Sequence, residues 1–329
     1  MAKVLLLYNA PVLPADHPDA ESERDLLHTV DAVHQALLPY EHQVTTLGLT
    51  DTPEHLLNAV QTTQPDVVFN LFEGFGNRPA SEYHVAGLLN WLDVPYTGCP
   101  VEAMVIGRDK VRTKQLLRGA GLPTAEFIVV DDSSNIALPQ SWPVIVKPAG
   151  TDASIGIDQG SVVSDAAALH KQVASVLQRY GSPVLIETYL PGPEFNVGVI
   201  ESPELKALPI AEMVYTPQPG VQWPIVSYAS KWDTGSAEDL AMQPRCPAQI
   251  SEDLCDRLQS IALAAFQLIG CKDVARIDCR LDAAGVPNIL EVNPNPDLGS
   301  TAGLARMLRT AEIPYGQFIN QMVRNHLAP

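Results

Sequence analysis

The chain has 329 residues, which is long for one average domain and suits two or three. Its formal net charge of −17 would repel nucleic-acid phosphates and anionic lipid, so we expect neither nucleic acid nor a membrane as a partner. The apolar run near the N-terminus is too short for a signal peptide, and no later stretch approaches the length of a membrane span. These features favour a cytoplasmic protein.

Metal-binding and hydrolase motifs are missing from the sequence. The five cysteines form no CxxC pair, and the eight histidines form no HxH or HExxH motif. Neither a zinc site nor a serine hydrolase is therefore indicated. The 28 prolines indicate many loops and helix ends rather than long helices.

Short strands alternate with helices over the first hundred residues. The pattern predicts strands at 3–9, 43–49, 66–72 and 94–98, and helices at 21–38, 52–61 and 81–93. In the first of these helices the apolar residues at helical spacing are Leu26, Val30, Val33 and Leu37. Such alternation is typical of a parallel α/β domain, which we assign to residues 1–108.

The pattern changes after residue 100. Two helices are expected at 100–107 and 108–121, followed by strand signals at 127–130, 143–148, 184–190 and 195–200 with one helix at 164–181. We assign a second, α+β domain to residues 109–190 and a third domain to residues 191–329. The third domain is expected to hold a long irregular loop at 217–242, a helix at 252–268, a hairpin and a C-terminal helical segment.

The segment 275–295 is predicted to be a hairpin with its turn at 282–287. If it is symmetric about that turn, Asp278 faces Glu291 and Arg276 faces Asn293, and all four side chains project from one face. Opposed carboxylates repel unless solvent or a cation lies between them. Three oxygen ligands, Asp278, Glu291 and Asn293, suit a hard cation such as Mg²⁺; the alternative is a solvated acidic hairpin.

Two further segments carry groups suited to a nucleotide. Lys147 ends an apolar strand and precedes the small residues 149–156, whose backbone N–H groups could approach phosphates; the alternative is a lysine that only reaches solvent. Glu187 and Glu194 flank a Pro-Gly-Pro turn and could accept hydrogen bonds from adenine and ribose. Between them, Tyr189 and Leu190 could line an apolar slot, although glutamates flank many surface turns.

Lys110 and Lys231 are two more cations that could reach a polyphosphate. Lys110 opens a helix, and Lys231 lies in the 217–242 loop next to Trp232, where an exposed loop is a plausible lid. Taken singly, each is expected to be a solvated surface lysine.

Six ordered motifs resemble those of the ATP-grasp superfamily, and within it those of D-alanine–D-alanine ligases: DKVRTK, PVIVKPAGTDASIG, VLIETYLPGPEF, YASKW, ARIDCRLD and LEVNPNP. With ESER near the start and VPYTG before the second domain, the resemblance covers nearly the whole chain. It implies a three-domain fold that holds ATP between two units bearing antiparallel sheets. It also implies a reaction in which a carboxylate attacks the γ-phosphate to give an acylphosphate, and an amine then displaces phosphate to form an amide.

The resemblance also implies roles for single residues. It places Arg276 at the oxyanion of the reaction and Glu23, in ESER, at the ammonium group of the first substrate. The hairpin residues Asp278, Glu291 and Asn293 would bind two Mg²⁺ ions, with Mn²⁺ as the alternative. The ATP phosphates would contact Lys110, Lys147 and Lys231, and the adenosine would contact Glu187, Tyr189, Leu190 and Glu194.

The chain departs from the ligase pattern at three positions. Ala153 stands where the ligases have serine, although Ser154 follows it and is a candidate catalytic residue, and Trp232 stands where many have tyrosine. Neither side chain offers the acceptor hydroxyl that links the lid to Glu23 in the family. Ala302 replaces a serine that grips the second substrate's carboxylate, with Ser300 and Thr301 nearby. The acceptor half of the site is therefore expected to differ.

The predicted function is an ATP-dependent ligase that joins an amino-acid carboxylate to an amine, with substrates not restricted to D-Ala. Two alternatives remain: a D-alanine–D-alanine ligase of cell-wall synthesis, and a catalytically silent ATP-binding module. The expected partners are small amino acids or amines, together with a second copy of the chain in a homodimer.

Overall fold

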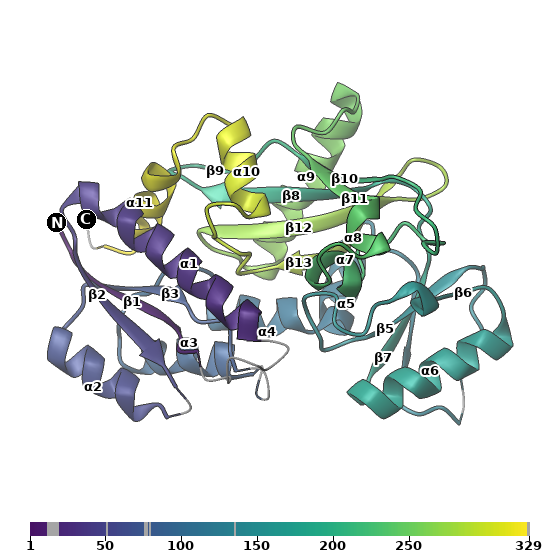
Figure 1. The fold of residues 1–329 in the computed structure, drawn as a ribbon, viewed down its shortest axis with the longest axis horizontal. Coiled ribbons are helices and arrows are strands. Elements are labelled where there is room, and N and C mark those ends of the chain that lie inside the picture. Colours follow the sequence, from purple (N-terminus) through teal and green to yellow (C-terminus); the bar gives the residue numbers. More distant parts are fainter. Residues whose placement is uncertain (12–19, 51, 76–77, 79, 135, 328–329) are drawn as a thin grey trace.

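The structure is a computed structural model that describes residues 1–329 except 12–19, 51, 76–77, 79, 135 and 328–329, and it does not describe the side chains of residues 20–25. Three separate sheets organise the chain (Figure 1). Along the described residues no helix combines the length and the apolar character that crossing a bilayer requires.

The N-terminal sheet is parallel, as predicted. Its order is β2-β1-β3, with β1 at Lys3–Asn9, β2 at Gln43–Leu49 and β3 at Val67–Leu71. The central strand β1 is an apolar run whose residues Leu5, Leu6 and Leu7 are fully buried, as expected for a strand covered on both faces. The connecting helices are α1 at Ala20–Leu37, the short 3-10 helix η1 at Leu38–Tyr40, α2 at Glu54–Thr63 and α3 at Ser81–Trp91.

The prediction of a strand at 94–98 is wrong. Only an isolated bridge forms there, between Val68 and Tyr96, with hydrogen bonds from Val68 N to Pro95 O and from Thr97 N to Val68 O. Pro95 has no N–H to donate to a longer ladder, and Gly98 turns the chain away at φ +92°.

Two helices and a small antiparallel sheet follow. The helices are α4 at Val101–Arg108 and α5 at Lys110–Gly119. Asp109 separates them and caps α5, because its side chain accepts a hydrogen bond from the N–H of Arg112. The sheet has the order β4-β7-β5-β6, formed by Phe127–Val130, Val184–Thr188, Val144–Pro148 and Val162–Val163, with the 3-10 helix η2 at Gln159–Ser161. Helix α6, Ala166–Tyr180, buries Leu169, Val173 and Val176 against it.

The C-terminal sheet has six strands. Its order is β11-β10-β8-β12-β13, with β9 also paired to β8. The strands are β8 at Glu194–Glu201, β9 at Leu205–Ala207, β10 at Ala211–Tyr215, β11 at Met242–Arg245, β12 at Val274–Leu281 and β13 at Pro287–Asn293. Helix α9, Glu252–Ile269, buries Leu258, Ala262, Ala265 and Phe266 in the same core as this sheet. The helices α10, Gly303–Thr310, and α11, Tyr315–Asn325, form the C-terminal helical segment.

The predicted irregular loop at 217–242 contains two short helices, so that prediction is wrong in part. They are α7 at Tyr228–Trp232 and α8 at Ala237–Ala241. Each begins at a serine cap: Ser227 accepts a hydrogen bond from Ser230 N, and Ser236 accepts one from Asp239 N. A side-chain cap satisfies a free N–H of the first turn, so each cap stabilises a short helix within the loop.

The three sheets lie in residues 3–71, 127–188 and 194–293. The strand predicted at 195–200 is β8, in the middle of the third sheet. The domain boundaries 1–108, 109–190 and 191–329 pass between the sheets and stay predictions.

Candidate functional site

The predicted pairing across the β12–β13 hairpin is confirmed. Asp278 lies opposite Glu291, and Arg276 lies opposite Asn293. The hairpin is not symmetric, however, because a β-bulge follows Asp278 and Cys279 pairs with Ile289. Bulges re-aim side chains next to functional sites, and this one brings the two carboxylates into opposition.

Both carboxylate oxygens of Asp278 accept hydrogen bonds. Arg276 donates to them through Nε at 2.7 Å and Nη2 at 2.8 Å. Asn196 on β8 donates to Oδ1 at 2.7 Å, and Asn293 donates to Oδ2 at 3.0 Å. Burial raises the pKa of Asp278, whereas Arg276 opposes that rise. The arrangement fixes Asp278 and aligns Arg276 along the sheet.

The carboxylate of Glu291 lies near several positively charged side chains. Burial would raise its pKa, but Lys110, then Lys231 and Lys147, hold that pKa well below its usual range. Lys110 Nζ lies 3.5 Å from Glu291 Oε2. Burial would likewise lower the pKa of Lys110, yet Glu291 and Asp152 raise it overall. Both side chains are therefore charged; Lys110 is almost completely buried and Glu291 is partly exposed.

The hairpin residues fit a hard cation that arrives with other oxygen ligands. They offer two carboxylates and one amide, which is a suitable donor set for Mg²⁺ but an incomplete one. In the described part of the chain, no group of three or more His, Cys, Asp or Glu side chains is placed to hold a metal. Water and phosphate oxygens would have to complete the coordination.

Lys147 and Glu187 lie together with a lysine that sequence reasoning missed. Lys147 Nζ is 2.8 Å from Glu187 Oε1, and Lys114 Nζ is 3.2 Å from Glu187 Oε2. Lys114 is fully buried and also donates to Thr124 Oγ1 at 2.7 Å. Burial lowers the pKa of Lys114 to about 8, although Glu187 opposes this. The spacing of four residues from Lys110 was the available signal, because it puts both lysines on one face of α5.

Glu194 and Tyr189 meet at a second buried cation, Arg280. Arg280 Nη1 lies 3.1 Å from Glu194 Oε2, and Nη2 donates to Tyr189 Oη at 3.1 Å and to the carbonyl of Pro224. Burial raises the pKa of Glu194, and Arg280 opposes that rise. Leu190 is buried beside them. Sequence reasoning missed Arg280, although its position two residues beyond Asp278 predicts the same face of the strand.

The loop after β5 and the segment containing α7 are joined by hydrogen bonds. Ser154 Oγ donates to the carbonyl of Val226 at 3.0 Å, and Trp232 Nε1 donates to the carbonyl of Ala153 at 3.1 Å. Lys231 is exposed overall, yet its pKa is lowered, first by partial burial of the ammonium group and then by Arg276. These contacts fasten the segment of Lys231 to the loop after β5. The side chain of Glu23 lies outside the described residues.

The segment after β13 adopts a tight loop. Asp297 Oδ1 accepts a hydrogen bond from Gly299 N at 2.7 Å, and Arg309 donates to the carbonyl of Ser300. Ala302 is the N-cap of α10 and provides no side-chain cap, as expected for a residue without a hydroxyl. A hollow of about 30 Å³ lies between this segment and the end of β3, lined in part by Thr29, Asn70, Glu73 and Asn295.

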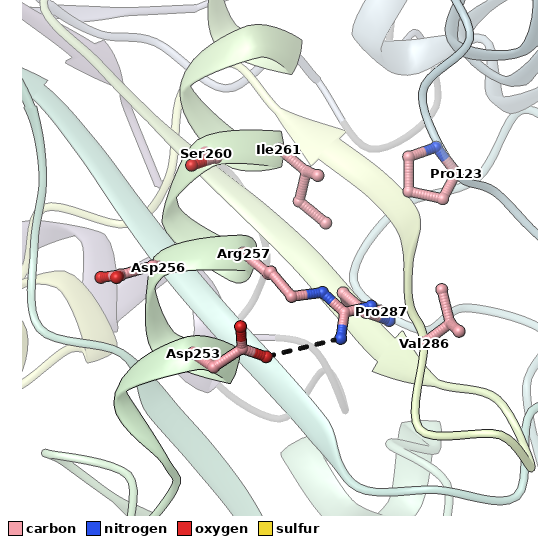
Figure 2. A pocket seen from close by; sticks show the side chains of 8 residues that line it. All are labelled: Pro123, Asp253, Asp256, Arg257, Ser260, Ile261, Val286 and Pro287. Atoms are coloured by element: carbon pink, nitrogen blue, oxygen red, sulfur yellow. Dashed lines mark ion pairs between the residues drawn. The ribbon is translucent and has the colours of Figure 1, made fainter.

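A larger cavity lies elsewhere. It has a volume of about 280 Å³ and is lined by Pro123, Asp253, Asp256, Arg257, Ser260, Ile261, Val286 and Pro287. Figure 2 shows the Asp253–Arg257 ion pair on α9 facing the hairpin turn. None of the predicted site residues whose side chains the structure describes lines this cavity, so it is separate from the arrangement around Glu291.

Comparisons with known proteins match most of the chain. The family described as "D-ala D-ala ligase C-terminus" matches residues 116–324. The D-alanine–D-alanine ligase of Rhizobium meliloti (strain 1021) is 32% identical over 281 residues, covering 84% of this chain and 85% of that protein. The uncharacterized protein y4sG of Sinorhizobium fredii is 32% identical over 259 residues, covering 77% of this chain and 72% of that protein.

Solved structures share the fold. The D-alanine–D-alanine ligase of Bacillus anthracis complexed with ATP superposes with a TM-score of 0.74 at 18% identity, covering 99% of this chain and 98% of that one. The predicted fold class is therefore confirmed: α/β and α+β units in an ATP-grasp arrangement, with a parallel N-terminal sheet.

Proposed function

Because the chain belongs to the D-Ala–D-Ala ligase family, we propose that the face of the β12–β13 hairpin is its active site and that amide formation there proceeds through an acylphosphate. The family and the fold make the chain an ATP-dependent, ADP-forming ligase that makes amide bonds. The observation that carries the site assignment is the position of Glu291, an ionised carboxylate opposite Asp278 and surrounded by the charges of Lys110, Lys147 and Lys231.

The three lysines provide the charge that a triphosphate needs. Lys110 and Lys147 are almost completely buried, so their ammonium groups are held in place before the ligand arrives. Lys231 would reach the phosphates from the segment that the Trp232–Ala153 hydrogen bond fastens. Lys110 would replace its contacts with Glu291 and Asp152 by contacts with phosphate oxygens.

The adenosine would lie beside the turn between β7 and β8. Glu187 and Glu194 are ionisable acceptors for the adenine amino group and the ribose hydroxyls, and each is held by a buried cation. Tyr189 and Leu190 supply the apolar surface next to them. A carboxylate has more acceptor capacity when it is ionised, so Arg280, which opposes the rise in the pKa of Glu194, supports this role.

Asp278, Glu291 and Asn293 would hold Mg²⁺, and Mn²⁺ has the same preference for oxygen. When bound, the metal neutralises charge on the transferred phosphoryl group. Asp278 would also orient Arg276. It accepts hydrogen bonds from Nε and Nη2 of Arg276, which leaves Nη1 to stabilise an oxyanion. Ser154 holds the neighbouring loop through the Val226 carbonyl.

We further propose that the substrates are not restricted to D-Ala. Ala302 brings no hydroxyl to the start of α10, and Ser300 and Thr301 are the nearby groups that could contact an acceptor. Glu23 on α1 remains the proposed contact of the first substrate's ammonium group. The relatives named as D-alanine–D-alanine ligases keep that dipeptide as the alternative product. A cytoplasmic location and a homodimer also stay predictions.

The experiment is ADP and phosphate release by the purified protein with a panel of D- and L-amino acids and amines, followed by mass spectrometry of the products. We expect release that depends on Mg²⁺ and is stimulated by specific amino acids. Tight ATP binding without stimulated release would favour a silent ATP-binding module instead. D-Ala-D-Ala formed as fast as any other product would identify the narrower activity.

A further inference from the structure

Arg108 joins two acidic residues that belong to different parts of the fold. It is the last residue of α4, and its Nη1 lies 2.8 Å from Glu82 Oε2 on α3 and 3.2 Å from Asp152 Oδ2 in the loop after β5. The second oxygen of Asp152 lies 3.4 Å from Lys110 Nζ. Lys110 in turn reaches Glu291 at 3.5 Å. Five side chains of alternating charge thus form a row from α3 to the hairpin: Glu82, Arg108, Asp152, Lys110 and Glu291.

Asp152 is an unfavourable neighbour for a phosphate. It belongs to the loop of small residues that follows Lys147, and it competes with any phosphate oxygen for Lys110. Lys110 Nζ also donates to the carbonyl of Thr151, which keeps the ammonium group next to this loop. A carboxylate there needs its own cation if Lys110 is to exchange partners when ATP binds.

We propose that Arg108 is a positioning residue that neutralises Asp152 and thereby leaves Lys110 available to the phosphates of ATP. The inference rests on the proposed function, because Lys110 is assigned to the phosphates there. The Nη1 atom of Arg108 reaches both carboxylates at once, Glu82 at 2.8 Å and Asp152 at 3.2 Å. It therefore holds Asp152 whether or not a nucleotide is present.

Glu82 is the anchor that holds Arg108. Its side chain is largely buried, and burial raises its pKa while Arg108 opposes that rise. Asn295 Nδ2 also approaches Glu82 Oε1 at 3.4 Å, and Asn295 Oδ1 accepts a hydrogen bond from Cys99 N at 3.1 Å. Glu82 is thus hydrogen-bonded to Asn295, in the segment that follows β13. A chain of contacts therefore runs from Asp152 through Arg108 and Glu82 to Asn295.

The test is titration calorimetry with a non-hydrolysable ATP analogue and Mg²⁺. Arg108→Gln is expected to weaken binding by about tenfold, because Asp152 then competes unopposed for Lys110. Asp152→Asn alone should bind the analogue as tightly as the wild type or more tightly. The double variant should regain the affinity of Asp152→Asn to within about twofold, which is a non-additive result expected only of coupled residues.

A matched control is Arg112→Gln. Arg112 is on the neighbouring helix and pairs with Asp109 at 3.1 Å, so it should leave binding unchanged. Arg108→Lys keeps a charge near Asp152 and should recover most of the affinity. In turnover assays, Arg108→Gln should raise the KM for ATP while kcat changes little.

Three outcomes would overturn the inference alone: wild-type affinity in Arg108→Gln, weaker binding in Asp152→Asn, or a double variant as weak as Arg108→Gln. The last would mean that Arg108 acts only through Glu82 as a structural group. If Arg108→Gln does not fold by circular dichroism, Asp152→Asn and Arg108→Lys still decide the question. A wild-type protein that binds no nucleotide would overturn the proposed function as well.

Discussion

The indole Nε1 of Trp232 donates a hydrogen bond to the backbone carbonyl of Ala153 at 3.1 Å. The resemblance to the ligase motifs implies hydroxyl side chains at both positions, and the link between the two segments is made here by an indole and a carbonyl. Ala153 and Ser154 both have positive φ, +55° and +61°, a conformation that residues other than glycine rarely adopt. The contact of Ser154 with Val226 lies beside it.

Trp232→Phe is expected to loosen this link. The ring is kept while the donor is lost, and one hydrogen bond contributes ~1 kcal/mol, which corresponds to about fivefold in the KM for ATP. Hydrogen exchange of the amides in 226–232 should become faster. Trp91→Phe is the control, since Trp91 is an exposed tryptophan at the end of α3. Equal KM values and equal exchange in the two variants would contradict the role of the link.

Glu291→Gln is expected to remove turnover, by about 10³-fold or more, because the substitution deletes the charge that would bind Mg²⁺ opposite Asp278. Gln has nearly the same shape, so the fold should persist by circular dichroism. ADP release measures the effect across Mg²⁺ concentrations, with Glu204→Gln on an exposed turn as control. Activity that survives the substitution would remove the metal assignment from the hairpin.

The hairpin shows how far sequence reasoning reaches. The two-residue period of strands placed Arg276 and Asp278 on one face, and the assumption of a symmetric turn gave the correct pairing of Asp278 with Glu291. The bulge could not be foreseen. Close to the turn Leu281 pairs with Pro287, a register that would have put Leu290 opposite Asp278 without the bulge. A bulge depends on packing across the sheet and leaves no local pattern here.

The sequence also failed to predict several short strands and two buried cations, for two physical reasons. The strands β6, β10 and β11 have two to five residues each and pair with distant segments, so they carry little periodic signal. Lys114 and Arg280 were missed because a charged residue is expected to be exposed unless a partner is known. Both are buried, and their partners Glu187 and Glu194 lie far away in the sequence.

Arg280→Met tests the ionisation of Glu194. Burial raises the pKa of Glu194 and Arg280 opposes the rise, so removing Arg280 should raise that pKa further. The protonated carboxyl loses acceptor capacity toward a ribose. The KM for ATP should therefore increase more steeply in the variant than in the wild type as the pH falls from 8 to about 6. Arg280→Lys keeps the charge and should follow the wild type; parallel profiles for Arg280→Met would contradict the proposed pairing.

Lys114→Met tests the buried Lys114–Glu187–Lys147 cluster through stability. The pKa of Lys114 falls from 10.5 to about 8 in the folded protein, chiefly through burial. Between those values the unfolded chain binds more protons than the folded one, so the free energy of unfolding rises with pH, and below about pH 8 the full cost of burying the charge is present. The wild type should therefore gain stability relative to Lys114→Met from pH 7.5 to pH 9.5. Urea unfolding of both proteins at the two pH values measures this gain. Lys171→Met, on the exposed face of α6, is the control. If the difference in unfolding free energy between the wild type and Lys114→Met does not change with pH, Lys114 does not titrate in this range.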